Sequence, residues 1–173
     1  MKLLNGPVSF YGAKVRIAAA EKGIALEVED VAFDLRKSPP YLGHPEVDRI
    51  NPQRQVPVLI DEGLEIFDST LIQEYFEDLY PEPALWPSEP RNRAAARLIE
   101  LKIDEVWFPK VLKARDYLRS PPSPEADAAR AAALAVYPQI EAVLGDRSYL
   151  DGPFTYADPA AWLLLLFGDL LGV

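Results

Sequence analysis

Two short strands, the turn between them and the start of a helix follow one another directly in residues 56–69. The apolar run Val58–Ile60 and the returning run Leu64–Phe67 predict a β-hairpin. Its connection is the three-residue segment Asp61–Gly63, in which glycine can take a positive φ. The pair Asp68-Ser69 then supplies the N-cap of a helix. This order leaves few folds open, because the hairpin must lie beside the beginning of the helix.

Pro57 stands at the mouth of the first of these strands. A proline there cannot donate to the sheet ladder, so the backbone pairing stops at this point. The helix that begins at Ser69 opens beside the same place. A helix N-terminus next to an unpaired backbone edge is suited to hold a small anionic peptide.

Composition excludes several classes of function. The net charge of −9 over 173 residues argues against nucleic-acid partners and against binding to anionic membranes. The absence of cysteine excludes disulfides, thiolate zinc sites and a protein thiol nucleophile, and it fits a cytoplasmic protein. The single histidine, His44, excludes a site built from several histidines, so we expect no metal. The N-terminus lacks the features of a signal peptide.

The segment before residue 81 alternates strands and helices. Apolar spacing predicts a strand, a loop, a helix, a second strand and one helical turn before the hairpin, over Lys2–Leu4, Val8–Gly12, Ala13–Lys22, Ile24–Val31 and Glu46–Ile50. After the hairpin we expect a helix over Ser69–Tyr80. Its apolar stripe would consist of Leu71, Ile72, Tyr75, Phe76 and Leu79.

The segment after residue 90 shows only helical patterns. Prolines make residues 81–90 a stiff linker, so the expected domains are 1–80 and 91–173. We predict a long helix over Arg91–Arg119 with a kink at Pro109, and a second helix over Glu125–Leu144. A capping box of Thr155 and Asp158 would start a third helix, whose apolar run Trp162–Phe167 is too short to span a bilayer and should be buried on nearly all sides.

This order of elements resembles that of the cytosolic glutathione S-transferases, in a serine-type, bacterial-like form. The resemblance implies a thioredoxin-like N-terminal domain of order βαβαββα, with a mixed four-stranded sheet, and an all-α C-terminal domain. That second domain ends at Val173, earlier than is usual in the family. The motifs that carry the resemblance are Ser9 with Lys14–Ala18, Glu21–Ile24, Asn51-Pro52, Val56–Leu59, Asp68-Ser69 with Ile72 and Tyr75, and Tyr149-Leu150 with Thr155–Asp158.

The resemblance implies a glutathione site at the hairpin. Pro57 would be the cis-proline of the family, and the Val56 backbone would pair with the cysteinyl unit of glutathione. Ser69 and the N–H groups of its helix would bind the γ-glutamyl carboxylate, and Asp68 would bind the ammonium. The alternative interpretation is a plain strand end followed by an ordinary N-cap.

Ser9 matches the position of the catalytic hydroxyl in the family. It would donate a hydrogen bond to the glutathione sulfur, and the helix that follows would further favour the thiolate. Tyr11 is the second choice for this role, and it could instead line the pocket for the electrophile. A serine that only caps the first helix is the alternative interpretation of Ser9.

Further contacts follow from the resemblance less directly. Lys37 and Gln55 stand where the family often holds the glycyl carboxylate, and Arg54 or His44 could replace Lys37. The electrophile pocket would be lined by Tyr11, Trp107, Val111 and Arg115. Trp107 could equally be part of a core between the domains.

The resemblance implies a glutathione transferase that conjugates the glutathione thiolate to a small hydrophobic electrophile. Glutathione would be the co-substrate and no further cofactor is expected. The helix Ser69–Tyr80 and the helix from Arg91 would form a symmetric homodimer. The family's oxidoreductase branch is excluded, because it needs a protein thiol. The alternative is a non-catalytic binding or regulatory protein of the stringent starvation type, since fold alone does not decide activity.

Overall fold

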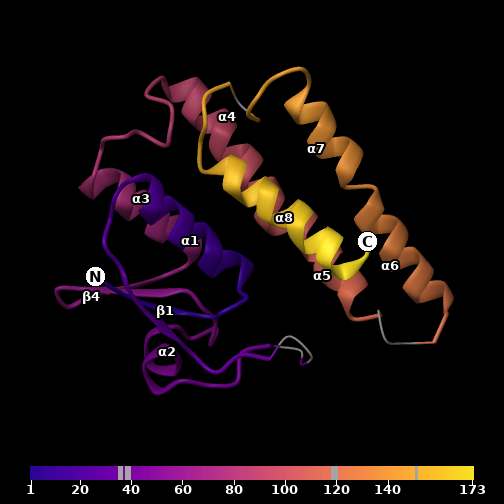
Figure 1. Cartoon of the computed structure of the whole chain (residues 1–173), viewed down its shortest axis with the longest axis horizontal. Helices are drawn as coiled ribbons and strands as arrows, with labels where there is room; N and C mark the ends of the chain where they lie inside the picture. Colours follow the sequence, from indigo (N-terminus) through magenta and orange to yellow (C-terminus); the bar gives the residue numbers. More distant parts are fainter. Residues whose placement is uncertain (35–36, 38–39, 118–120, 151) are drawn as a thin grey trace. The chain divides into compact units, whose positions relative to one another are not determined.

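The chain divides into two units, Met1–Ala84 and Leu85–Val173. The computed structural model describes residues 1–34, 37, 40–117, 121–150 and 152–173. Strands and helices alternate in the first unit, whereas every regular element described in the second unit is helical (Figure 1). This is the predicted combination of a thioredoxin-like domain and a helical region.

A four-stranded sheet forms the centre of the first unit. Its strands are β1 (Lys2–Asn5), β2 (Glu27–Asp30), β3 (Val58–Asp61) and β4 (Leu64–Phe67). Their order in the sheet is β2-β1-β3-β4, with β1 parallel to β2 and antiparallel to β3. β3 and β4 form the predicted antiparallel hairpin. The sheet is therefore mixed, as expected.

Helices cover both faces of this sheet. α1 (Phe10–Glu21) and α3 (Ser69–Leu79) lie against each other on one face, and α2 (Pro45–Ile50) lies on the other (Figure 1). On the side of α2, one apolar cluster joins the sheet to the helix, and its buried members are Leu4, Val31, Val47, Val56 and Val58. The cluster ties the segment before Pro57 to the centre of the sheet.

Several boundaries in the first unit differ from prediction, including β2, which begins at Glu27 rather than Ile24. Two of the differences have a clear local cause. α1 begins at Phe10 rather than Ala13, because Ser9 already acts as N-cap and its Oγ accepts a hydrogen bond from the Gly12 N–H at 3.2 Å. The hairpin loop has two residues, not three. Glu62 and Gly63 both have positive φ, 47° and 91°, which suits the type I′ turn that matches the twist of paired strands.

The predicted apolar stripe of α3 is only partly buried. Ile72 and Phe76 are fully buried, but Leu71 is 56% exposed and Leu79 is also exposed. Polar residues occupy the rest of the buried face, because they find partners there. For example, Gln73 lies on that face, and its Nε2 donates to the Lys14 carbonyl at 3.4 Å.

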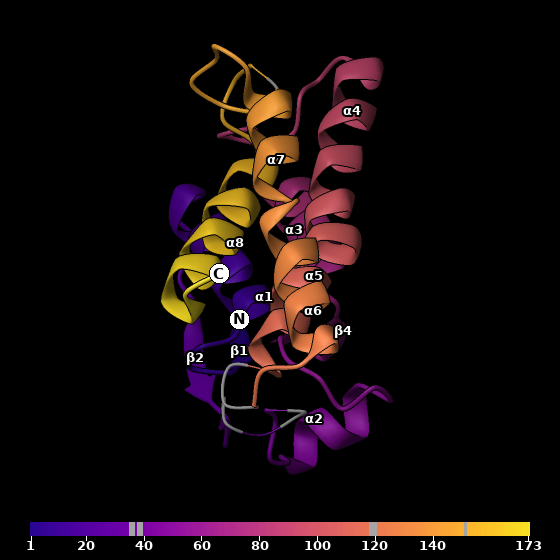
Figure 2. The same cartoon turned by 90° about the vertical axis from the view of Figure 1, so that its right-hand side faces the viewer.

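The second unit consists of helices packed along one another. The described segments are α4 (Pro90–Leu101), the π-helical segment η1 (Lys102–Trp107), α5 (Phe108–Arg115), α6 (Pro124–Leu134), α7 (Tyr137–Leu144) and α8 (Ala157–Leu171). α8 packs against α4 and α5 (Figure 1), and α6 packs against α5 (Figure 2).

Prolines shape these helices in ways that spacing alone did not predict. A π-helical segment interrupts the long helix just before Pro109, where a kink was predicted. The Phe108 N–H donates to the Ile103 carbonyl, five residues back, which makes a π turn. This turn accommodates Pro109, which has no backbone N–H to donate. The predicted end of this helix at Arg119 lies outside the described residues. The predicted helix Glu125–Leu144 is two helices, because Pro138 sits in the first turn of α7 and α6 ends at Leu134.

Thr155 and Asp158 pair before α8, but the N-cap of this helix is Tyr156 and not Thr155 as predicted. The Thr155 N–H donates to Asp158 Oδ2 at 2.7 Å, while Asp158 Oδ1 accepts from the Leu150 N–H at 2.8 Å. Burial on nearly all sides was wrong, since Trp162 on this helix is 57% exposed. Among the residues described, no helix has both the length and the hydropathy to cross a membrane.

A buried ion pair connects the ends of α1 and α3 in the first unit. The Lys22 ammonium lies 2.7 Å from Glu77 Oε2, and the two side chains are 0% and 7% exposed. The same nitrogen donates to the carbonyls of Tyr80 and Pro83, both at 2.8 Å. Lys22 therefore joins the end of α1 to the end of α3 and to the chain that leaves it. Removing one partner would leave a buried charge uncompensated.

We predict that Lys22→Met lowers the free energy of unfolding by about 3–5 kcal/mol, because the buried Glu77 carboxylate loses the ammonium beside it. Urea denaturation measures this change. In the double variant Lys22→Met/Glu77→Leu the loss should be smaller, since the buried carboxylate is then also removed. A single variant as stable as the wild type would contradict the role of the pair.

Candidate functional site

The sheet register brings three predicted site segments to one end of the sheet. Leu4 of β1 pairs with Val58 of β3, and Val58 pairs with Phe67 of β4. The chain leaves β1 toward Ser9, enters β3 from Val56-Pro57, and leaves β4 into Asp68-Ser69. Because β1 and β4 both run antiparallel to β3, all three segments meet at this end. The hairpin motif predicted that the segments at Pro57 and Asp68 meet, and the resemblance added Ser9 to them.

Ser9 is held by its own backbone and by α1. Its N–H donates to the Gly6 carbonyl at 2.9 Å, and its Oγ accepts from the Gly12 N–H at 3.2 Å. A serine hydroxyl that accepts in this way still has its own O–H to donate. Capping the helix and donating to a ligand are therefore compatible roles for Ser9, and the geometry does not force a choice between them.

Asn5 and Gly12 support this segment, and sequence reasoning missed both. Asn5 is 1% exposed, and its Nδ2 donates to Asp30 Oδ1 at 2.7 Å, which joins the ends of β1 and β2. A Cβ on Gly12 would lie 2.0 Å from Asn5 Oδ1, so only glycine fits against it.

The segment before β3 is organised by Asn51, another residue that the sequence analysis did not assign to the site. Its Nδ2 donates to the Gln55 carbonyl at 2.9 Å, and its Oδ1 accepts from the Gln53 N–H at 2.9 Å. The Val56–Pro57 peptide bond that follows is cis. Since β3 begins at Val58, the Val56 backbone lies before the ladder.

Asp68 adopts an unusual backbone conformation at the start of α3. Its φ of 80° and ψ of 124° lie in a region that costs a side-chain-bearing residue about 1–3 kcal/mol. Its Oδ1 accepts from the Leu71 N–H at 3.0 Å, so it is an N-cap. The side chain of Asp68 is nevertheless exposed, while Ser69 beside it is 3% exposed. A glycine could act as the N-cap in this backbone conformation without strain. The carboxylate of Asp68 is therefore not required by the backbone and is available for contact with a ligand.

The candidates for a glycyl carboxylate differ in their surroundings. Lys37 is exposed, and its N–H donates to the Asp34 carbonyl, but residues on either side of it lie outside the described part. Gln55 is exposed. The two possible replacements are already paired with carboxylates, because Arg54 Nε lies 3.0 Å from Asp48 Oδ1 and His44 Nε2 lies 3.0 Å from Glu29 Oε1.

Asp48 anchors the chain around this segment. It accepts hydrogen bonds from Arg54 and from the Tyr41 hydroxyl, and these bonds lower the pKa of its carboxyl below the ordinary value. Burial, followed by the Asp48 contact, raises the pKa of the Tyr41 hydroxyl to about 12. Tyr41 therefore stays protonated and donating at neutral pH.

The residues predicted for the electrophile pocket belong to both units. Tyr11 lies in the first turn of α1, with its ring edge-on to Phe10. In the second unit, the Trp107 Nε1–H donates to Gln139 Oε1 at 3.2 Å, and Val111 is fully buried. An Arg115 guanidinium nitrogen lies 3.0 Å from Asp116 Oδ1. A pocket that joins them to Ser9 stays a prediction.

Several known proteins are similar to this chain in sequence or in fold. Residues 3–84 match the family model described as glutathione S-transferase, N-terminal domain. A stringent starvation protein A homolog of Pasteurella multocida is 35% identical over 114 residues, which cover 66% of this chain and 50% of that protein. The chain thus spans about half the length of several curated relatives it matches.

Two further comparisons cover nearly the whole chain. A tobacco (Nicotiana tabacum) protein, "Probable glutathione S-transferase parC", is 34% identical over 91% of this chain and 68% of its own length. A crystal structure of a glutathione S-transferase from Methylobacterium radiotolerans, in complex with glutathione sulfonate, superposes with a TM-score of 0.75. It is 28% identical, over 96% of this chain and 77% of that one.

We predict that Asn51→Ala lowers the free energy of unfolding by about 1–3 kcal/mol, because the Gln55 carbonyl and the Gln53 N–H lose their partner. Urea denaturation measures the loss, and hydrogen exchange at the Gln53 amide should become faster. Asn92→Ala, which truncates an exposed asparagine on α4, is the matched control and should change neither quantity. Unchanged exchange at Gln53 would contradict this role of Asn51.

Proposed function

The chain belongs to the glutathione S-transferase family, and we propose that it binds glutathione at the end of the sheet where Val56, Pro57, Asp68 and Ser69 meet. The observation that carries this proposal is the pairing of Leu4, Val58 and Phe67, which directs the three site segments to one end. The related Methylobacterium protein crystallised with glutathione sulfonate supports the choice of ligand.

Each part of glutathione would meet a group of matching chemistry. The Val56 backbone, which precedes the ladder, offers an N–H and a carbonyl to the cysteinyl unit. The first turn of α3 with the Ser69 hydroxyl suits the γ-glutamyl carboxylate, because helix N-termini favour anions. The exposed Asp68 carboxylate suits the ammonium. Gln55, with Lys37 as a further candidate, would bind the glycyl carboxylate.

We also propose that the bound thiol reacts as a thiolate with a small hydrophobic electrophile. The Ser9 O–H would donate to the sulfur, and the N-terminus of α1 would add a favourable potential. The thiol proton leaves to solvent, the sulfur forms a bond to the electrophilic carbon, and the leaving group departs with its electron pair. Tyr11 is the second candidate donor, and Trp107, Val111 and Arg115 are proposed to contact the electrophile.

A non-catalytic binding or regulatory protein is the second candidate. The stringent starvation protein A homolog that is 35% identical over two thirds of this chain favours it. The two candidates differ in the fate of the thiol. A regulatory protein would bind glutathione weakly or not at all and would conjugate nothing, whereas a transferase would do both.

A symmetric homodimer is part of the proposal. Leucines that face solvent on α3 and α4 support it, namely Leu71, Leu79, Leu98 and Leu101. Exposed apolar side chains grouped on helices are typical of contact surfaces. Sedimentation as a monomer at all concentrations would contradict this assembly.

We predict that Asp68→Gly weakens glutathione binding at least about tenfold, because a charge-assisted contact to the ammonium is lost. Stability should stay the same or rise, since glycine relieves the backbone strain and caps nearly as well. Isothermal titration and urea denaturation measure the two effects. Glu62→Gly is the matched control, since it removes a charge at another positive φ and should leave binding unchanged.

An Asp68→Gly variant that binds glutathione as the wild type does would reduce Asp68 to a helix cap. Absence of any glutathione binding by the wild-type chain would refute the proposed function itself and would favour the regulatory protein.

We predict that Ser9→Ala lowers kcat/KM for conjugation of a generic aryl halide by about 100-fold, because the thiolate loses a preorganised donor. The ultraviolet absorbance of bound thiolate, followed against pH, should show a raised thiol pKa. Tyr11→Phe is the control and should change neither. If Ser9→Ala is unaffected and Tyr11→Phe is impaired, Tyr11 is the donor.

A further inference from the structure

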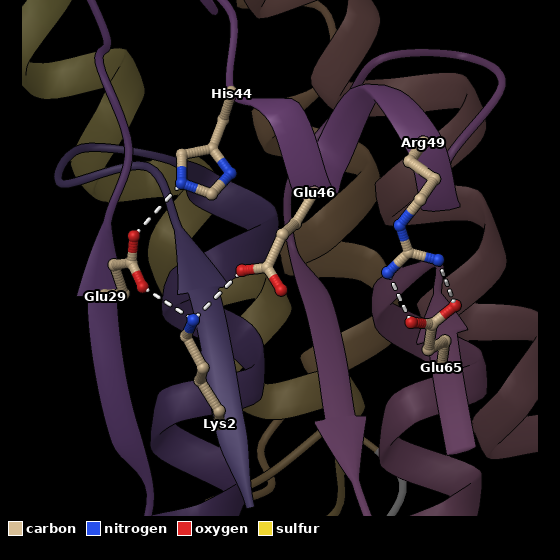
Figure 3. Close-up of polar contacts among 6 residues, drawn as sticks. All are labelled: Lys2, Glu29, His44, Glu46, Arg49 and Glu65. Carbon is tan, nitrogen blue, oxygen red and sulfur yellow. Dashed lines mark hydrogen bonds and ion pairs between the residues drawn. The ribbon is translucent and has the colours of Figure 1, made fainter. Parts of the chain in front are cut away.

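Four charged or ionisable side chains converge on the side of the sheet that α2 covers. Lys2 comes from β1, Glu29 from β2, and His44 and Glu46 from the start of α2 (Figure 3). The Lys2 ammonium lies 2.8 Å from Glu29 Oε2 and 3.0 Å from Glu46 Oε2. His44 Nε2 lies 3.0 Å from Glu29 Oε1. Apart from His44, none of these residues is proposed to contact glutathione.

The donor atoms fit a metal ion of a particular class. One ligand atom each of Glu29, His44 and Glu46 lies within 4.8 Å of the others. Ligands at about 2.1 Å from one ion lie at most about 4.2 Å apart, so small side-chain rotations would close the cluster. One imidazole nitrogen and two carboxylate oxygens suit zinc and similar transition ions, whereas magnesium and calcium prefer oxygen ligands alone.

We propose that Glu29, His44 and Glu46 form a binding site for a divalent transition cation such as zinc, in which the Lys2 ammonium takes the place of the ion when none is bound. This site goes beyond the proposed transferase function.

The charges of the cluster support this exchange. With a neutral imidazole, two carboxylates and one ammonium leave a net charge of −1. Replacing the ammonium by a divalent ion neutralises the cluster. The Lys2 side chain is 29% exposed, so its flexible stem can swing into solvent.

The backbone at the start of α2 also fixes the positions of two of the proposed metal ligands. His44 and Glu46 flank Pro45, whose ring fixes φ at the first turn of α2. Val47, directly after them, is fully buried in the apolar cluster beneath. His44 Nδ1 is buried and has no hydrogen-bond partner among the described residues, while Nε2 is the nitrogen that faces Glu29. Nε2 therefore points toward the carboxylates, and an ion bound to it would replace the Nε2–H contact with Glu29.

A neighbouring ion pair on the same helix serves as the control. Arg49 and Glu65 form two hydrogen bonds (Figure 3). This pair holds a single carboxylate and a guanidinium that stays charged, so it offers no metal site.

The test uses tag-free protein and the fact that His44 is the only histidine. Zinc sulfate is titrated into ¹⁵N-labelled wild type and Lys2→Met, and the imidazole nitrogens are followed by NMR. We expect the Nε2 signal to shift, with a Kd at least about tenfold lower in Lys2→Met, because the competing ammonium is gone. Magnesium chloride should cause no shift. Lys2→Gln repeats the test should the methionine variant fold poorly.

Carboxylate variants locate the ion. Glu29→Gln and Glu46→Gln should each raise the zinc Kd at least about tenfold, and Glu65→Gln should leave it unchanged. If the His44 signals of Lys2→Met and Lys2→Gln stay fixed at millimolar zinc, the cluster is an ion-pair network only and the proposal is wrong. Equal zinc affinity in Glu29→Gln, Glu46→Gln and wild type would also overturn it, since His44 would then bind alone.

Discussion

The register of three strands is the constraint on which the candidate site depends. Leu4, Val58 and Phe67 lie side by side across β1, β3 and β4. A slip of one residue in this pairing would turn Val58 out of the apolar cluster and would invert every side chain of the strand. The same slip would separate Ser9 from Pro57 and Asp68. Burial of the cluster thus fixes both the fold of the first unit and the meeting of its site segments.

Buried polar contacts secure the segments around this register. Asn5 holds the end of β1 to Asp30, and Asn51 folds the segment before Pro57 upon itself. Lys22 joins the C-terminal ends of α1 and α3 through its ion pair with Glu77. Each contact is costly to break, because a buried polar group without a partner is destabilising. These contacts hold in place the segments that would form the proposed glutathione site.

The elements that depend on interactions within a few residues along the chain were predicted well. The hairpin, the N-cap at Asp68 and the pairing of Thr155 with Asp158 follow from hydrogen bonds or φ preferences within a few residues. The π-helical segment before Pro109 was expected only as a kink, and the second helix was expected to continue through Pro138. Their form depends on how neighbouring helices hold the chain, which spacing does not reveal. The contact between Gly12 and Asn5 was missed for the same reason, since it joins a helix to a strand end.

The sequence by itself determined the order of elements in the first unit and the family, and it proposed most of the candidate site residues, because those rest on local patterns and motifs. Only the tertiary structure decided which side chains meet. It paired His44 and Arg54 with carboxylates, rotated the buried face of α3 toward Gln73 and Glu77, and gathered Lys2, Glu29 and Glu46 from three distant segments. Such contacts arise from packing between elements, and packing depends on distances in space that no local pattern encodes.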